Sequence, residues 1–369
     1  MKVFQRRINP RLYIPKKQKS EGTGSGSDTD LVAEAFSKEG SRFDAIDRSI
    51  VNALGFVNGL TKRLQTGTER CDFVIKIIDC SSSMTINDTF IASQKNIPQK
   101  ASRWHELCHH LAFGHHFFSG FQITSELTYW PSGKNPGIKT TSKPYLLAAE
   151  MLPLLSELKN IIPIGPSNIP QTINHVTRIL QEKRQTQSGY VLLVIYTDGS
   201  HQERANHRLS AMLQKFDHLH SHFELRVVVR LTTGDEQTIS LYNEYDKKAL
   251  PFEFDVIGNC VQENKEYQLA GNDYLISSPI LSEWRTIGCG TGLMDSLDEK
   301  PLIPAEIRDL VAAFLKIDPG SLGTPEKDPH GLTNAVTALN NSLTEPVIDI
   351  KRLEKALTEV KNSLHIQRL

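Results

Sequence analysis

The central part of the chain alternates between short apolar runs and amphipathic stretches. Apolar runs typical of buried strands occur at 73–78, 190–196, 223–231 and 252–257, and residues 121–130 alternate between apolar and polar side chains as a strand does. Hydrophobic residues recur at helical spacing in the stretches between them, at 101–118, 144–160, 169–184, 202–217 and 236–249. Strands that are apolar on both faces and alternate with helices are typical of a mostly parallel sheet that helices cover. We therefore predict an α/β, doubly wound fold.

The two ends of the chain depart from this alternation. Residues 1–28 combine a basic segment without acidic residues and a Gly/Ser-rich stretch, which predicts a flexible basic tail and linker. Residues 29–66 predict an N-terminal helical extension, and 67–298 carry the α/β pattern. Prolines punctuate short amphipathic patterns in residues 299–369, which predicts a C-terminal helical region.

Composition narrows the classes of function. The 42 basic and 42 acidic residues give a formal net charge of zero. The overall charge therefore does not favour binding to nucleic acid. The five cysteines are scattered without a Cys-x-x-Cys pair, which favours a reducing compartment. No apolar run of membrane-spanning length and no apolar N-terminal signal region occur. The expectation is therefore a cytoplasmic protein without a membrane span.

Polar motifs follow the strands at points where a metal site would form. An Asp-x-Ser-x-Ser motif at 79–83 follows the first apolar run, and Thr-Asp-Gly at 197–199 follows the run at 190–196. A Gly-Pro-Ser loop at 165–167 precedes a predicted helix. Ligands of parallel sheets bind at the carboxyl ends of strands, and Mg²⁺ prefers oxygen ligands. The candidate ligands are Asp79, Ser81, Ser83, Ser167 and Asp198.

These motifs resemble the von Willebrand factor type A (VWA) domain and its metal-ion-dependent adhesion site (MIDAS), over roughly residues 70–295. The matching residues are Asp79, Ser81, Ser83 and Asp198. Ser167 stands where the family usually has Thr, and Thr172 is a weaker candidate for that role. The resemblance implies a Rossmann-like fold and a bound Mg²⁺ or Mn²⁺.

Neutral hydroxyl ligands leave most of the positive charge on the ion. If Ser81, Ser83 and Ser167 bind it directly, while Asp79 and Asp198 hold metal waters, the ion favours a carboxylate from another molecule. No obvious nucleophile or general base accompanies the motifs. The prediction is a non-enzymatic module that captures Asp or Glu of a protein partner. A bacterial effector that acts in a host cytoplasm is a further hypothesis.

Three alternatives remain open. His105-Glu106-x-x-His109 fits the HExxH pattern of zinc metallopeptidases, although Ala112 stands where families with a third histidine ligand expect Gly. A looser metal patch would use the histidine-rich helix, with His105, His109, His110, His115 and His116. The third alternative is a VWA scaffold with a non-functional metal site, because Ser167 departs from the family pattern.

Overall fold

The computed structural model describes residues 71–366 apart from several internal segments. These segments are 93–97, 121–124, 130–138, 142–157, 159–161, 168, 184–189, 200–204, 249, 288–295, 316, 324–327 and 343–345. The predicted tail (1–28), the predicted N-terminal helical extension (29–66) and almost all of the helix expected at 144–160 lie outside the described residues.

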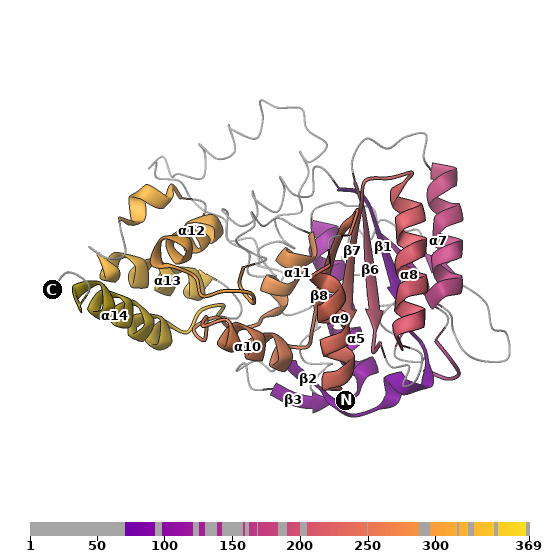
Figure 1. The fold of residues 1–369 in the computed structure, drawn as a ribbon, viewed down its shortest axis with the longest axis horizontal. Coiled ribbons are helices and arrows are strands. Elements are labelled where there is room, and N and C mark those ends of the chain that lie inside the picture. Colours follow the sequence, from indigo (N-terminus) through magenta and orange to yellow (C-terminus); the bar gives the residue numbers. More distant parts are fainter. Residues whose placement is uncertain are drawn as a thin grey trace, which may run out of the picture.

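A six-stranded sheet forms the centre of the molecule, in the order β5-β4-β1-β6-β7-β8. Figure 1 labels four of its strands, β1, β6, β7 and β8. Its strands are β1 (Cys71–Ile78), β4 (Ser125–Tyr129), β5 (Lys139–Thr141), β6 (Tyr190–Thr197), β7 (Leu225–Leu231) and β8 (Glu253–Ile257). All neighbouring pairs are parallel except the edge pair of β4 and β5. The predicted α/β fold with a mostly parallel sheet is therefore confirmed.

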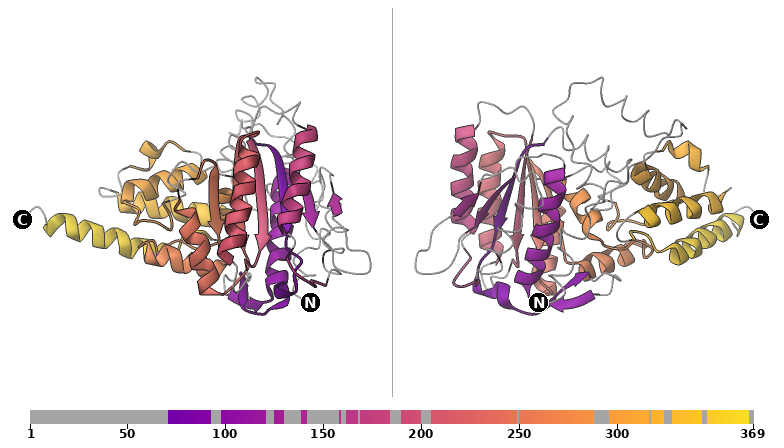
Figure 2. Two further views of the ribbon diagram at one scale, coloured as in Figure 1. Left: turned by 45° about the vertical axis from the view of Figure 1, so that its right-hand side comes forward. Right: turned by 180° about the vertical axis from the view of Figure 1, so that it is seen from behind.

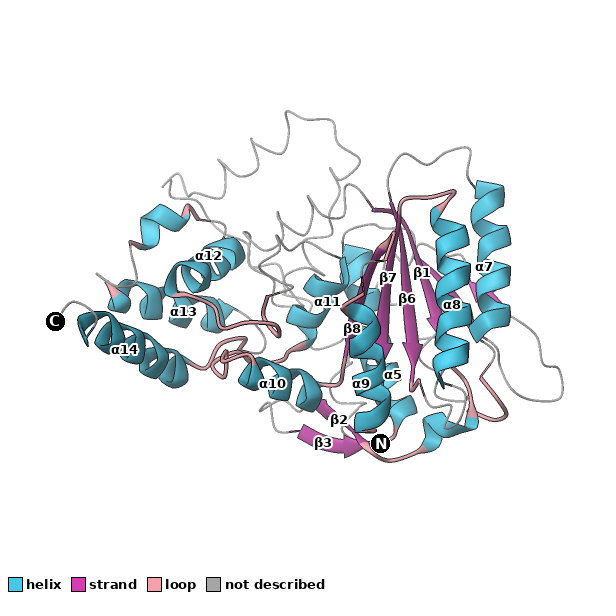
Figure 3. Cartoon of the chain, viewed as in Figure 1, coloured by secondary structure: helices cyan, strands magenta, loops and turns pink. Residues whose placement is uncertain are grey.

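Helices lie on both faces of this sheet, as Figure 3 shows. The helices of this part of the chain are α5 (Arg103–Gly120), α7 (Ile169–Lys183), α8 (Ala205–His220), α9 (Glu236–Asp246), α10 (Cys260–Leu269) and α11 (Pro279–Ile287). A short antiparallel pair, β2 (Thr89–Ala92) and β3 (Pro98–Ala101), precedes α5.

The alternation of side chains along β1 explains the two layers. Val74 and Ile78 belong to the apolar cluster that includes residues of α5 and α11. Ile75 and Ile77 belong to a second cluster, with residues of α7 and α8. Successive strand residues point to opposite faces, so an uninterrupted apolar strand requires apolar cover on both sides.

The C-terminal helices lie to one side of the sheet (Figure 2), and their apolar residues belong to the same cluster as residues of α5, α10 and α11. They are α12 (Pro304–Leu315), α13 (Pro329–Ser342) and α14 (Ile350–Ile366). An isolated bridge pairs Leu275 with Ile348, and the amide of Ile276 donates to the carbonyl of Val347 at 2.9 Å. No helix in the described part of the chain is both long and apolar enough to cross a membrane.

The order of the strands determines where a ligand site forms. In the sheet, β4 is the neighbour of β1 on one side and β6 is its neighbour on the other side. The direction of winding therefore reverses between β1 and β6, and the crevice at their carboxyl ends is a topological switch point. Asp79 and Asp198 directly follow these two strands.

Candidate metal-binding site

Asp79 and Asp198 lie side by side at the ends of neighbouring strands, and both are fully buried. The amide of Asp79 donates to the carbonyl of Tyr196 at 2.9 Å, which extends the strand pairing by one step. The hydroxyl of Thr197 donates to Oδ2 of Asp79 at 2.8 Å. Burial raises the pKa of Asp79, and the negative charge of Asp198 raises it further. A divalent cation between these carboxylates would relieve both effects.

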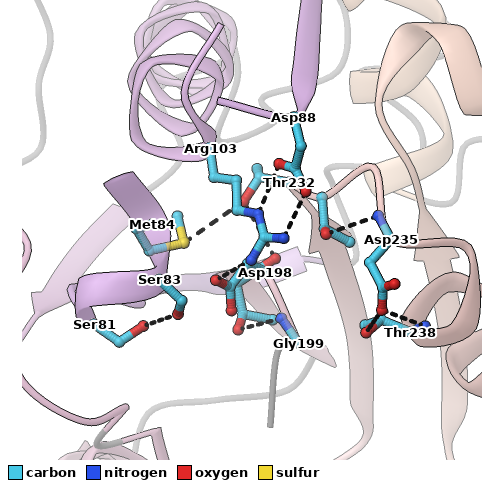
Figure 4. A network of polar contacts seen from close by, with 12 residues as sticks. Ser81, Ser83, Met84, Asp88, Arg103, Asp198, Gly199, Thr232, Asp235 and Thr238 are labelled. Atoms are coloured by element: carbon cyan, nitrogen blue, oxygen red, sulfur yellow. Dashed lines mark hydrogen bonds and ion pairs between the residues drawn. The ribbon is translucent and has the colours of Figure 1, made fainter. Parts of the chain in front are cut away.

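The loop after Asp79 brings two predicted hydroxyl ligands together. The amide of Ser81 donates to Oδ1 of Asp79 at 2.9 Å, and the chain then enters a short 3-10 helix, η2 (Ser82–Thr85). The hydroxyl oxygens of Ser81 and Ser83 lie 3.0 Å apart and share a hydrogen bond (Figure 4). Neighbouring oxygens around Mg²⁺ are separated by about 3 Å when each lies about 2.1 Å from the ion. The two hydroxyls therefore have the spacing of adjacent ligands.

The third predicted segment is tied to this loop by the backbone. The amide of Ile164 donates to the carbonyl of Cys80 at 3.0 Å, and the amide of Ser82 donates to the carbonyl of Gly165 at 2.9 Å. Ser167 follows two residues later. Its hydroxyl oxygen is buried and has no hydrogen-bond partner among the described residues. A buried hydroxyl without a partner is uncommon, and a metal ion would supply one. The weaker candidate, Thr172, lies buried within α7.

A guanidinium that the sequence analysis missed lies on Asp198. Arg103, the first residue of α5, donates from Nη1 to Oδ2 of Asp198 at 2.7 Å. It also donates from Nε and Nη2 to the two oxygens of Asp88, at 2.8 Å and 2.6 Å (Figure 4). Burial acts to lower the pKa of Arg103, but the hydrogen bonds to Asp88 and Asp198 outweigh it and raise this pKa. A fixed positive charge therefore already faces one of the predicted metal residues.

The turn after Asp198 is close-packed. Gly199 has a φ of +61°, and a Cβ at this position would lie 2.7 Å from a ring carbon of Tyr242. The amide of Thr232 donates to the carbonyl of Thr197 at 2.9 Å, so the end of β7 supports the same turn. The Thr-Asp-Gly motif therefore has a steric requirement for Gly in addition to its carboxylate.

The HExxH alternative has little support in the described residues. Glu106 is fully buried, and its Oε2 accepts a hydrogen bond from the hydroxyl of Thr89. Burial raises the pKa of Glu106 to about 8. In the part of the chain that the structure describes, no cluster of three metal-ligating side chains includes His105 or His109.

The looser histidine patch is divided by the packing of α5. His110 is buried, and its Nδ1 lies 2.8 Å from Nη2 of Arg230 on β7. Burial and the charge of Arg230 lower the pKa of His110 well below its usual value. The side chains of His115 and His116 lie outside the description.

A second acidic cluster lies away from the predicted site and was not anticipated. Carboxylate oxygens of Glu263, Glu266 and Asp298 all lie within 4.8 Å of one another, beside a groove of about 1000 Å³. Arg285 donates to Glu263 at 2.7 Å and lies 3.1 Å from Asp298 and 3.0 Å from Asp255. The single positive charge of Arg285 offsets part of this negative charge, and burial raises the pKa of Glu263 to about 8. The signal in the sequence is weak, since Glu263 and Glu266 lie on α10 whereas Asp298 lies in a turn 32 residues after Glu266.

Comparisons with known proteins add little to this picture. No protein-family model matches the chain, and no curated protein matches it. One solved structure that it matches is a mutant of the PilB minor pilin from Streptococcus sanguinis, at 12% identity and a TM-score of 0.33. The match covers 50% of this chain and 57% of that one, so the chain spans little more than half the length of the pilin structure.

Proposed function

We propose that the chain is a VWA-like, MIDAS-type module that binds Mg²⁺ or Mn²⁺ and captures an acidic side chain of a protein partner. The observation that carries this proposal is the buried, unpartnered hydroxyl of Ser167, on a loop tied to the one that holds Ser81 and Ser83. In this proposal the three hydroxyls from two joined loops would bind the ion beside the buried pair of Asp79 and Asp198.

The roles of these residues follow from their charge and burial. Ser81, Ser83 and Ser167 would bind the ion directly as neutral ligands. Asp79 and Asp198 would accept hydrogen bonds from the metal waters, as outer-shell carboxylates commonly do. The ion would retain most of its positive charge, so a carboxylate from a partner is the favoured final ligand.

Exposed apolar side chains on the same loops favour a protein as the partner. Ile86 follows η2 and is 46% exposed, while Ile162 and Ile164 are 68% and 55% exposed. Large apolar side chains gathered at one place on a surface are typical of protein interaction sites. A partner that places Asp or Glu on the ion would cover them.

The proposed role is non-enzymatic. The described hydrogen-bond partners of the three loops are hydroxyls, carboxylates, backbone groups and the guanidinium of Arg103. None of these is a histidine or lysine that would serve as a general base at neutral pH. The arrangement suits ion-mediated docking.

Isothermal titration of the purified full chain with Mn²⁺ tests the proposal. The wild type should bind one ion, and Ser81→Ala combined with Ser83→Ala should abolish the binding while the circular dichroism spectrum stays unchanged. The matched control is Ser240→Ala, an exposed serine on α9, which should bind as the wild type does. A folded wild type that takes up no Mn²⁺ at millimolar concentration would overturn the proposal.

A further inference from the structure

We infer that Arg103 sets the metal affinity of the proposed site, because its guanidinium is a resident cation that the divalent ion must displace from Asp198. This inference rests on the proposed function. It goes beyond that function because it makes metal uptake conditional on an internal ion pair.

The geometry makes Arg103 a competitor for the ion rather than a surface charge. Its side chain is 5% exposed, and that of Asp198 is completely buried. The 2.7 Å contact between Nη1 and Oδ2 is a charge-assisted hydrogen bond in a region from which water is largely excluded. Such a contact occupies the oxygen that a metal water would use, and its positive charge repels a second cation nearby.

Asp88 gives the guanidinium a place to remain when it leaves Asp198. Two nitrogen atoms of Arg103 bind the two oxygens of Asp88, and the side chain of Asp88 is 30% exposed. Because this bidentate pair can persist, Arg103 can lose Asp198 without becoming an unpaired buried charge. The displacement is therefore compatible with the fold.

A partner carboxylate would favour that displacement. It adds a negative charge on the ion, which strengthens binding of the metal relative to the guanidinium. Coupling between two ligands is reciprocal, so the metal also strengthens binding of the partner. The site then fills with metal chiefly when an acidic partner is present.

The first test compares Mn²⁺ affinity in the wild type and in Arg103→Met, which keeps an unbranched, flexible side chain and removes the charge. The dissociation constant should fall about tenfold or more, the low end of the effect of a neighbouring charge on a buried acid. The matched control is Arg178→Met, an exposed arginine on α7, which should leave the affinity unchanged. Equal affinities of wild type and Arg103→Met would overturn the inference and leave the proposed function intact. Absence of binding in both would overturn the two together.

A second measurement uses the wild type alone and covers the case in which Arg103→Met does not fold. In protein labelled with ¹⁵N-arginine, Mg²⁺ should shift the Nε resonance of Arg103 in step with saturation of the site, while that of Arg178 stays in place. Saturable Mg²⁺ binding with an unmoved Arg103 resonance would overturn the inference.

Discussion

The hydroxyl of Thr197 donates to Oδ2 of Asp79 at 2.8 Å, although 118 residues separate the two in the chain. The same hydroxyl accepts a hydrogen bond from the amide of Gly199 at 3.1 Å. Together with the amide of Ser81 on Oδ1, this contact fixes both oxygens of the Asp79 carboxylate. The orientation of a proposed metal residue is therefore set before any ion arrives, by a neighbour on the adjacent strand.

Thr197→Val removes this hydroxyl and keeps the shape of the side chain. The carboxylate of Asp79 then loses one buried hydrogen bond, as does the amide of Gly199. We expect a loss of about 2 kcal/mol in the free energy of unfolding, measured by urea denaturation, together with weaker Mn²⁺ binding in calorimetry. A variant as stable as the wild type would contradict the role assigned to this contact.

Metal affinity should depend on pH through Asp79. Burial and the charge of Asp198 raise the pKa of Asp79 above its ordinary value of 3.8. The ion requires the ionised carboxylate, so binding releases a proton wherever the free site is protonated. Mn²⁺ affinity should therefore fall as the pH falls through the raised pKa, and it should level off above that pKa. Calorimetry in buffers of different ionisation enthalpy measures the released proton directly, and a flat profile down to pH 4 would contradict the prediction.

Asparagine at the two carboxylates should have opposite effects on the stability of the metal-free protein. A raised carboxyl pKa means that the ionised form of Asp79 costs folding free energy at neutral pH, and Asp79→Asn removes that cost. Asp198→Asn instead takes one charged partner from the buried Arg103. We expect an unchanged or higher melting temperature for Asp79→Asn. For Asp198→Asn, we expect a loss of about 2 kcal/mol.

Thermal unfolding in EDTA, followed by circular dichroism, measures both effects of the asparagine substitutions. Both variants should fail to bind Mn²⁺. Asp79→Asn should lose metal binding without losing stability, whereas Asp198→Asn should lose both. The idea fails if Asp79→Asn proves the less stable of the two.

Asp79 and Asp198 were predictable because each directly follows a run of apolar residues. Strand ends are a local feature of the sequence, and parallel strands bring those ends to one edge. The strand β1 and the helix at 169–184 were predicted within two residues of their observed bounds. Periodicity over six or more residues is enough to locate such elements.

Arg103 was not predictable in the same way. It lies 95 residues before Asp198, and an arginine at the start of a helix has no local pattern that names its partner. The neighbouring histidines, His105 and His109, form a short motif that supported only an alternative zinc hypothesis and did not point to Arg103. The packing of α5 against the sheet determines the positions of both residues: it brings Arg103 to the strand ends and buries Glu106. Such pairings depend on tertiary structure and not on spacing.

Alanine at Gly199 and at Gly165 should separate steric strain from backbone strain. Both glycines have positive φ values, of +61° and +82°. A Cβ at Gly199 would lie 2.7 Å from Tyr242 and 2.8 Å from Thr238, whereas one at Gly165 would meet open space. We expect losses of about 3 kcal/mol or more for Gly199→Ala and about 1 kcal/mol for Gly165→Ala, by urea denaturation. Equal losses would mean that the neighbours of Gly199 move aside freely.

Glu106→Gln tests whether the glutamate of the HExxH pattern is a buried structural group. Its pKa rises on folding from the model-peptide value of 4.5 to about 8, chiefly because of burial. The folded state thus holds this proton more tightly, so the wild type loses stability as the pH rises between these two values. A glutamine side chain does not titrate. The free energy of unfolding of Glu106→Gln should therefore increase relative to that of the wild type through this pH range, and the difference should stay constant above it.

Urea denaturation at several pH values between about 4.5 and 9 measures this difference between Glu106→Gln and the wild type. The control is Glu354→Gln, an exposed glutamate on α14, which should follow the wild type at every pH. If the free energy of unfolding depends on pH in the same way in Glu106→Gln and in the wild type, the pKa of Glu106 is ordinary, as expected of a carboxylate that faces water. Zinc that copurifies in equal molar amount, is lost on His105→Ala or His109→Ala and stays on Glu106→Gln would restore the metallopeptidase hypothesis, because in the HExxH pattern the histidines bind zinc and the glutamate is the general base.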